Sequence, residues 1–346
     1  MPSDKVLVTG ANGFVATHVV DVLLSKGYKV IGTARSEAKY ETLLKEFKAK
    51  YPHGNISFEI VKDIATANAF DEVLKKHSDI KHVIHTATPV VFGLDKSPEE
   101  VYRAPAVEGT KNILTAIRDY GRQVEHVVIT SSQGTMIEFD RVVQPLIDEN
   151  YWSSLTWDQV GDNDMKGYVA SKKLAEKAAW DFTKTESPNF ALTTITPPYI
   201  FGPQVFDSQV GKTLNASNQV LVNTLSIDPK TTEAQKGNHG LYVDVRDVAS
   251  AHVAPLTTTT TNNKRLLPVA GSFSIQSLLD AINKIPSLKG KVAVGDSSYI
   301  DSEEYHKTKS TFNNSLTVKL LGNIQFTQLE KVVSDTIEQY SRVNTV

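Results

Sequence analysis

The stretch that decides the fold lies near the start of the chain, where residues 9–16 read Thr9-Gly10-Ala11-Asn12-Gly13-Phe14-Val15-Ala16. The spacing G-x-x-G-x-x-A falls between a β-branched run at 5–9 and an amphipathic run at 13–26. Gly10 permits a tight turn, Gly13 lets backbone N–H groups approach a phosphate without an intervening β-carbon, and Ala16 keeps the helix close to the sheet. The positive end of the helix dipole adds to the attraction for a pyrophosphate. The motif predicts a dinucleotide site, with an ordinary structural turn as the alternative.

Alternation of strand and helix continues through the first two hundred residues. Short runs rich in Val and Ile, nearly continuous in their hydrophobicity, are typical of strands buried on both faces of a parallel sheet. They lie at 5–9, 29–33, 57–61, 82–86, 125–130 and 191–196. Helical patterns lie between them at 13–26, 38–50, 67–76, 99–120 and 168–185. We therefore expect an α/β fold with a doubly wound parallel sheet of the Rossmann type.

The pattern becomes less regular after a cluster of turn-forming residues, Pro197, Pro198, Gly202 and Pro203. Helical patterns at 210–225, 275–285 and 329–340 and a strand-like run at 266–269 follow. We expect a dinucleotide-binding Rossmann domain over residues 1–200 and a smaller C-terminal α/β substrate domain over residues 201–346. Part of 240–270 is expected to pack back onto the cofactor domain.

Composition excludes several classes of protein. Lys and Arg number 37 and Asp and Glu number 39, so a net charge of −2 gives no bulk positive field for nucleic acid or an anionic membrane. The chain has no cysteine, which excludes disulfides and thiolate metal ligands, and none of its nine histidines is grouped at a metal-binding spacing. Neither a secretory signal nor a run of ~18 apolar residues is present. We expect a cytoplasmic protein with no metal, nucleic-acid or membrane partner.

The residues after the second strand favour one dinucleotide over the other. An NAD site usually ends this strand with Asp or Glu, whereas here Arg35 and Ser36 follow it. Arg35 offers a forked donor to a 2′-phosphate, and Lys39 adds a positive charge one turn later. This pattern favours NADPH, the alternative being that both are solvated surface charges. After the third strand, Asp63 and Ile64 lie where an adenine ring would meet the sheet, although Asp63 fits equally well as a helix cap.

Two groups of polar residues suit acid–base chemistry. Tyr168 and Lys172 lie four residues apart in a predicted helix, so the phenol and the ammonium share one face. A neighbouring cation lowers the phenol pKa from ~10 toward neutrality, as general acid–base catalysis requires. The fifth strand ends in Thr130-Ser131-Ser132 at the sheet edge where open α/β folds bind ligands. Alone, the Tyr/Lys spacing is more typical of a surface pair, but its combination with the glycine turn, Arg35 and the serines indicates a catalytic site.

These motifs resemble the extended short-chain dehydrogenase/reductases. Within them the similarity is to the dihydroflavonol-reductase-like branch, and most of all to fungal NADPH-dependent methylglyoxal, aldehyde and ketone reductases. Further matching blocks lie at 28–32, 85–89, 172–180, 197–203 and 242–248. Residues 105–110 read PAVEGT, the form seen in the reductase branch, where sugar-nucleotide epimerases usually carry Asn-Val-x-Gly-Thr. The resemblance is specific through about residue 255 and looser beyond it.

The resemblance implies an NADPH-dependent carbonyl reductase, which converts aldehydes or ketones to alcohols by hydride transfer. Tyr168 would donate the proton, Ser132 would hydrogen-bond the carbonyl oxygen, and Lys172 would lower the Tyr168 pKa and bind the nicotinamide ribose. The motifs and the resemblance together assign cofactor contacts to Gly10, Asn12, Gly13, Phe14, Val15, Arg35, Lys39, Asp63, Ile64, Thr86, Ala87, Thr88, Thr130, Tyr168, Lys172, Pro197, Tyr199 and Ile200. A pocket for a small hydrophobic carbonyl substrate is expected against Val90, Phe92, Gln133, Met136, Gly161, Tyr199 and Leu214.

Alternatives remain at this stage. One alternative is a different reaction on the same scaffold, that of an epimerase, a dehydratase or a hydroxysteroid-type dehydrogenase. A non-catalytic NADPH-binding protein is the other. Phe92 and Tyr199 also fit a role in packing the domain junction rather than lining a pocket. The chain carries no dimer-specific signal, so both a monomer and a homodimer agree with it.

Overall fold

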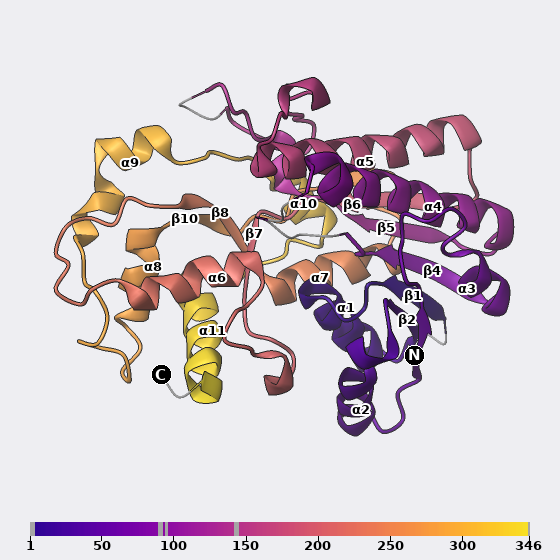
Figure 1. Cartoon of the computed structure of the whole chain (residues 1–346), viewed down its shortest axis with the longest axis horizontal. Helices are drawn as coiled ribbons and strands as arrows, with labels where there is room; N and C mark the ends of the chain where they lie inside the picture. The colour runs from indigo at the N-terminus through magenta and orange to yellow at the C-terminus, as the bar shows by residue number, and fades with distance from the viewer. Residues whose placement is uncertain (1–3, 89–92, 94–95, 142–144, 345–346) are drawn as a thin grey trace. The chain divides into compact units, whose positions relative to one another are not determined.

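The computed structural model describes residues 4–88, 93, 96–141 and 145–344. Its contacts divide the chain into two compact units, each discontinuous in sequence (Figure 1). The first comprises Met1–Ile137, Asn150–Thr196 and Ala249–Leu266, and the second comprises Glu138–Glu149, Pro197–Val248 and Leu267–Val346. Compared with the expected boundary at residue 200, the second unit begins at Pro197 and includes a short earlier segment. Within the expected 240–270 region, Ala249–Leu266 belongs to the first unit.

A parallel sheet of seven strands forms the centre of the first unit, in the order β3-β2-β1-β4-β5-β6-β9. The strands are β1 (Lys5–Thr9), β2 (Lys29–Ala34), β3 (Ile56–Ile60), β4 (Ile80–His85), β5 (His126–Thr130), β6 (Ala191–Ile195) and β9 (Lys264–Leu266). The first six confirm the predicted strands to within two residues, and the seventh begins before the predicted 266–269 run. Strand order reverses between β1 and β4, and open α/β sheets bind ligands at the carboxyl edge of such a switch point.

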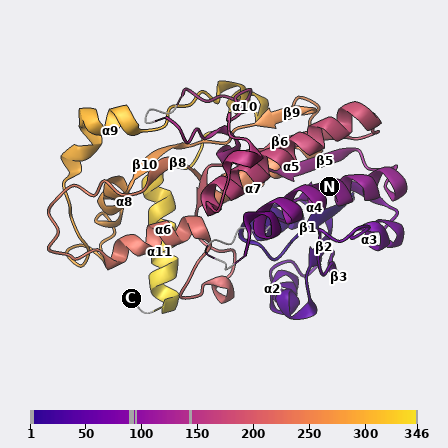
Figure 2. The same ribbon diagram turned by 45° about the horizontal axis from the view of Figure 1, so that its top comes forward.

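Helices cover both faces of this sheet. They are α1 (Phe14–Ser25), α2 (Glu41–Lys50), α3 (Asp71–Lys76), α4 (Ala104–Tyr120) and α5 (Asp164–Glu186), with a π-helical turn, η2 (Glu99–Arg103), leading into α4. Helices α4 and α5 run side by side (Figure 1 and Figure 2) and, with α3, bury an apolar cluster that includes Leu7, Val83, Ile113 and Leu192. Helices α1 and α2 lie on the opposite side of the sheet (Figure 1). The predicted doubly wound fold is confirmed.

Helix α5 begins four residues earlier than predicted. The Asn163 side chain accepts a hydrogen bond of 2.9 Å from the backbone N–H of Lys166, which caps the helix and lets it start at Asp164. Tyr168 therefore lies in the second turn and Lys172 in the third, away from the fraying end of the helix.

A three-stranded sheet organises the second unit. Its strands are β7 (Tyr199–Phe201), β8 (His239–Asp244) and β10 (Gly271–Ser274), and β8 pairs parallel to β7 and antiparallel to β10. The helices are α6 (Ala216–Asn223), α8 (Ile275–Ile282), α9 (Glu303–Thr308), α10 (Ser315–Leu320) and α11 (Leu329–Asn344), and α7 (Val245–Val253) passes from the second unit into the first. The core contains Phe201, Phe273, Leu278 and Ile337, among others. No helix in the described ranges has both the length and the hydrophobicity to cross a membrane.

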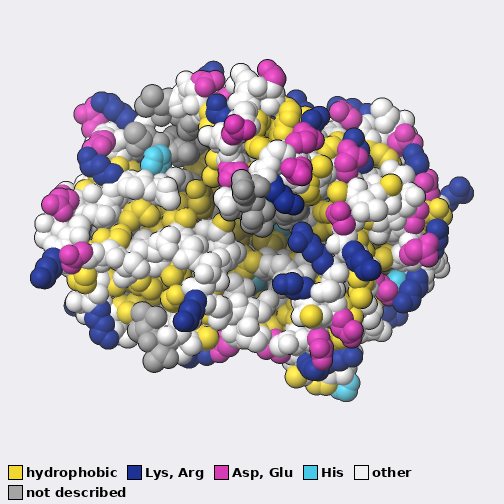
Figure 3. All heavy atoms as spheres, viewed as in Figure 1, with side chains coloured by type: hydrophobic (Ala, Val, Ile, Leu, Met, Phe, Trp, Pro, Cys, Tyr) yellow, Lys and Arg dark blue, Asp and Glu magenta, His cyan; other side chains and the backbone are white. Residues whose placement is uncertain are grey.

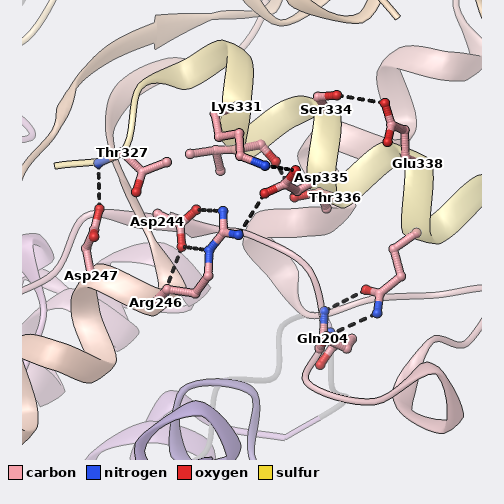
Figure 4. A network of polar contacts seen from close by, with 12 residues as sticks. Gln204, Asp244, Arg246, Asp247, Thr327, Lys331, Ser334, Asp335, Thr336 and Glu338 are labelled. Carbon is pink, nitrogen blue, oxygen red and sulfur yellow. Dashed lines mark hydrogen bonds and ion pairs between the residues drawn. The ribbon is translucent and has the colours of Figure 1, made fainter. Parts of the chain in front are cut away.

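A polar network joins β8 and α7 to α11 in the second unit (Figure 4). The Asp244 side chain is fully buried and accepts hydrogen bonds from the Arg246 guanidinium, which also donates to Asp335 at 2.7 Å. Asp247 accepts a 2.7 Å hydrogen bond from the backbone N–H of Thr327, and burial raises the pKa of the Asp247 carboxyl. Lys331 contacts the other oxygen of Asp335 from the solvent side. Arg246 is thus the cation that compensates the buried Asp244.

Replacement of Arg246 by Ala should lower the free energy of unfolding by about 2 kcal/mol, because a buried carboxylate loses its charged donor. The matched control is Lys331→Ala, which removes an exposed partner of the same network and should cost less than about 1 kcal/mol. Urea unfolding followed by circular dichroism measures both values. Equal losses in the two variants would contradict the role assigned to Arg246.

Candidate functional site

The glycine turn after β1 is built by short backbone contacts. Gly10 has a φ of +63°, and a β-carbon there would lie 3.0 Å from the Cα of Ala87. Its N–H donates to Thr33 Oγ1 at 3.1 Å, and the Gly13 N–H donates to the Gly10 carbonyl at 2.9 Å. Both the left-handed conformation and the close approach of the β4 loop therefore require glycine at position 10.

Helix α1 starts directly after this turn with an open N-terminus. Among the described residues no side chain caps it, and its first turn holds no acidic residue. The first backbone N–H groups, including those of Phe14 and Val15, lack intrahelical acceptors. Such a helix start attracts an anion such as a phosphate.

A cleft of about 310 Å³ lies over the turn, at the lower end of the ~300–1,000 Å³ found for ligand pockets. It is lined by Gly10, Asn12, Gly13, Thr33, Ala34, Arg35, Lys39, Val61, Ile64, Thr86, Ala87 and Thr88. Of these, Thr33, Ala34 and Val61 were not assigned from the sequence, although they belong to or follow strands that end at this edge.

The charges around this cleft would suit a phosphorylated ligand. Arg35 and Lys39 are exposed, and neither has an ion-pair partner within the described part of the chain. No carboxylate is among the described residues that line the cleft. Asp63 does not line it, and its Oδ1 accepts the Ala65 N–H at 2.9 Å within a turn. The next helix, α3, begins only at Asp71, so the alternative role of Asp63 as a helix cap is wrong. The residues present therefore fit a nucleotide that carries an additional phosphate.

Lys172 lies at the same edge of the sheet and is only 5% exposed. Its Nζ donates to the carbonyl oxygen of Thr130, the last residue of β5, at 2.7 Å. Burial lowers the pKa of Lys172 to about 8, and the nearby Glu176 carboxylate opposes that effect. His85, the last residue of β4, has a pKa lowered to about 3 by burial and by Lys172, so its imidazole is neutral at physiological pH.

Ser132 and Tyr168 converge on Gly134. The Ser132 Oγ lies 3.1 Å, and the Tyr168 Cε1 3.7 Å, from the point where a β-carbon of Gly134 would be. The Ser132 Oγ accepts the Gly134 N–H at 3.0 Å. The half-buried Tyr168 ring also meets the ring of Tyr102 edge-on, with centroids 6.5 Å apart. The first unit therefore brings together the three predicted catalytic side chains around α5 and the end of β5.

The remaining predicted pocket residues of the first unit differ in how far they are exposed to solvent. Gln133 is half-buried and Gly161 is exposed with a φ of +55°. Met136 has no exposed surface, so in this conformation it packs inside the first unit and does not line a pocket. Val90 and Phe92 lie outside the described residues.

Pro197, Tyr199, Ile200 and Leu214 belong to the second unit. The Tyr199 ring packs edge-on against that of Phe273, 5.2 Å between centroids, and burial raises the pKa of its phenol. Leu214 packs against the same core. Both side chains thus contribute to packing within the second unit.

Two buried charged residues near the site were missed by sequence reasoning. Glu176 lies one turn beyond Lys172 on α5, a spacing that could have indicated it. Its ion-pair partner is Arg265, 89 residues further along the chain, and no local pattern indicates such a contact.

Two observations bear on other kinds of site. Within residues 4–88, 93, 96–141 and 145–344, no group of three or more His, Asp or Glu side chains is arranged to hold a metal ion. On the face drawn in Figure 3, basic side chains are interspersed with acidic ones over much of the surface.

Comparison with known proteins agrees with this geometry. The NAD dependent epimerase/dehydratase family matches residues 6–267. The chain belongs to this family. Its members include the extended short-chain dehydrogenase/reductases, so the resemblance noted from the motifs is confirmed.

Two relatives within the family, the first compared both by sequence and by crystal structure, are similar over nearly the whole chain. The NADPH-dependent methylglyoxal reductase of Saccharomyces cerevisiae is 39% identical over 346 residues, which cover 97% of each chain. The crystal structure of the yeast methylglyoxal/isovaleraldehyde reductase with NADPH is 38% identical, with a TM-score of 0.90 over 99% of each chain. The Candida albicans homologue with NADPH is 40% identical, with a TM-score of 0.91 over 98% of this chain and 99% of that one.

The buried lysine gives a pH-dependent stability test. Because the pKa of Lys172 is about 8 in the folded protein and 10.5 ordinarily, the unfolded chain holds this proton more tightly between those values. This group therefore raises the free energy of unfolding as pH increases through that window, by at most about 3 kcal/mol. The Lys172→Met variant should lack this rise in the free energy of unfolding. Its free energy of unfolding should therefore compare most favourably with that of the native protein near neutral pH.

Urea unfolding near pH 7 and near pH 10 measures the effect. Lys184→Met is the control, because Lys184 is 74% exposed on the same helix and its replacement should leave the native pH dependence intact. A constant difference between Lys172→Met and the native protein across this range would refute the assignment.

Proposed function

We propose that the protein is an NADPH-dependent reductase of aldehydes and ketones. The observation that carries the proposal is the buried ammonium of Lys172, one helical turn from Tyr168 and beside the sheet edge that holds the phosphate-binding cleft. The relatives support it, since the yeast protein is named a methylglyoxal/isovaleraldehyde reductase and both it and the Candida albicans protein were crystallised with NADPH.

The cofactor would be held along the carboxyl edge of the sheet. The open start of α1 and the glycine turn suit the pyrophosphate, and Arg35 and Lys39 suit the 2′-phosphate of the adenosine half. We assign the loop of Thr86, Ala87 and Thr88, together with Thr130, to the ribose and nicotinamide side. When bound, NADPH supplies a hydride to the carbonyl carbon.

The chain's own residues would manage the carbonyl oxygen. Tyr168 donates a proton to that oxygen as negative charge develops on it. The Ser132 Oγ accepts the Gly134 N–H, so its hydroxyl hydrogen is available to donate to the same oxygen and stabilise its charge. The Lys172 ammonium lowers the pKa of Tyr168, which helps the phenol release its proton at working pH.

We further propose a small, hydrophobic carbonyl substrate, in keeping with the aldehydes named for the relatives. A cytoplasmic location and a monomeric or homodimeric state complete the proposal. An epimerase or dehydratase would be recognised by conversion of a nucleotide sugar without net consumption of NADPH, and a non-catalytic binder by tight NADPH binding without turnover.

Replacement of Tyr168 by Phe removes the proton donor and should lower kcat by about 10²–10⁴-fold. The dissociation constant for NADPH should stay within about twofold, because the lost hydroxyl faces the substrate oxygen. Tyr120→Phe, at a position 38% exposed, is the matched control and should keep native activity. The assays are NADPH consumption with isovaleraldehyde and titration of NADPH fluorescence; undiminished turnover by Tyr168→Phe would rule the phenol out as the acid.

Replacement of Arg35 by Asp should weaken NADPH binding by about 10–100-fold, the loss expected for a charged forked contact to phosphate. Binding of NADH should change little or improve. Arg122→Asp makes the same charge change at an exposed position that does not line the cleft, so it should bind NADPH as the native protein does. Fluorescence titration with each cofactor measures the preference. An Arg35→Asp protein that still binds NADPH about tenfold more tightly than NADH would show that the phosphate lies elsewhere.

A further inference from the structure

The Glu176 carboxylate is completely buried in the first unit and is surrounded by donors. The Ser131 Oγ donates to Oε2 at 2.6 Å, and the Thr194 Oγ1 donates to Oε1 at 2.7 Å. The Arg265 guanidinium, from β9, approaches both oxygens, with Nε 2.8 Å from Oε1 and one terminal nitrogen 3.2 Å from Oε2. This carboxylate therefore joins α5 to the ends of β5, β6 and β9.

Arg265 extends the network to the turn that carries Ser132. Its guanidinium lies 3.8 Å from the centre of the Trp152 ring and donates to the Thr135 hydroxyl. The Thr135 hydroxyl in turn donates to the Ser132 carbonyl at 2.8 Å. A buried ion pair thus ties the helix of Tyr168 and Lys172 to the turn of Ser132.

Glu176 also faces Lys172 across one turn of α5, and it is the carboxylate that stabilises the Lys172 ammonium. Among the described residues, the neutral His85 of β4 also lies close enough to the ammonium to be affected by it, and Tyr168 lies one turn before Lys172 on α5. His252 of α7 contacts the Thr130 hydroxyl at 2.7 Å, and Tyr102 of η2 meets the Tyr168 ring.

Burying an ion pair is a costly way to hold a core together, since well-packed apolar side chains are often as stabilising or more so. What the pair supplies here is direction, because the carboxylate and the guanidinium together hold the hydroxyl groups of Ser131, Thr194 and Thr135 in fixed positions. It also supplies negative charge beside the ammonium.

We propose that Glu176, held by Arg265, is a positioning residue that keeps Ser132 aligned with Tyr168 and retains the charge of Lys172. The proposal rests on the carbonyl-reductase function proposed above. Glu176 acts through these three residues and does not itself touch the substrate.

Glu176→Gln keeps the shape of the side chain and removes its charge. We expect kcat to fall about tenfold or more, while the dissociation constant for NADPH changes less than about threefold. The alkaline limb of the kcat/KM profile should move about one pH unit lower, because a lost negative charge lets the Tyr168/Lys172 pair release its proton more easily. A role in stability alone would not move that limb.

The double variant Glu176→Gln/Arg265→Met keeps the test decisive where the single variant fails to fold, since it removes both charges of the Glu176–Arg265 pair together. It should show the same loss of kcat and a smaller shift of the limb in the same direction. Glu149→Gln is the matched control, because it neutralises another buried glutamate, one that binds Thr317 in the second unit, and should keep the native profile.

A folded Glu176 variant with the native kcat and the native alkaline limb of the kcat/KM profile would overturn the proposal. A loss of kcat without any movement of that alkaline limb would overturn it as well. Native protein that consumes no NADPH with any carbonyl compound would instead refute the proposed function, and this inference with it. Thermal unfolding and NADPH titration of each variant establish that it is folded.

Discussion

The buried ammonium of Lys172 is the constraint on which the proposed site depends. Removing such an ion from water costs several kcal/mol, and the fold offsets the cost with the Thr130 carbonyl and the Glu176 carboxylate. The compensation is incomplete, because the pKa of Lys172 is lowered to about 8. A protein selected for stability alone would have little reason to keep a lysine there. In the proposed reaction the same ammonium makes Tyr168 an effective acid.

The two halves of the proposed cofactor site use different physics. At the glycine turn, the backbone does the binding, and close packing against Ala87 excludes a side chain at Gly10. At the end of β2, the proposed selectivity is electrostatic and is assigned to Arg35 and Lys39, two exposed cations in a cleft whose described lining residues include no carboxylate. In this proposal the glycine turn selects the cofactor by shape, and the end of β2 selects it by charge. A substitution in either should therefore leave a distinct signature on cofactor binding.

Much of this arrangement could be predicted from the sequence because the signals are local. Buried parallel strands are continuous in hydrophobicity, a glycine spacing marks the turn, and Tyr168 and Lys172 share a helix face. Helix α5 begins four residues before the predicted start, because the Asn163 side chain caps it there. The Arg265–Glu176 pair was missed because it depends on tertiary contact between β9 and α5. The burial of Met136 likewise depends on tertiary packing: its side chain, predicted to line the substrate pocket, is completely buried.

Isotope transfer tests the central claim most directly. The protein would be incubated in ordinary water with isovaleraldehyde and NADPH carrying deuterium at the reactive face of C4, and the alcohol examined by mass spectrometry. The account predicts that one deuterium appears on the former carbonyl carbon for each NADPH consumed. An alcohol without deuterium, or bound NADPH that is never consumed, would contradict it.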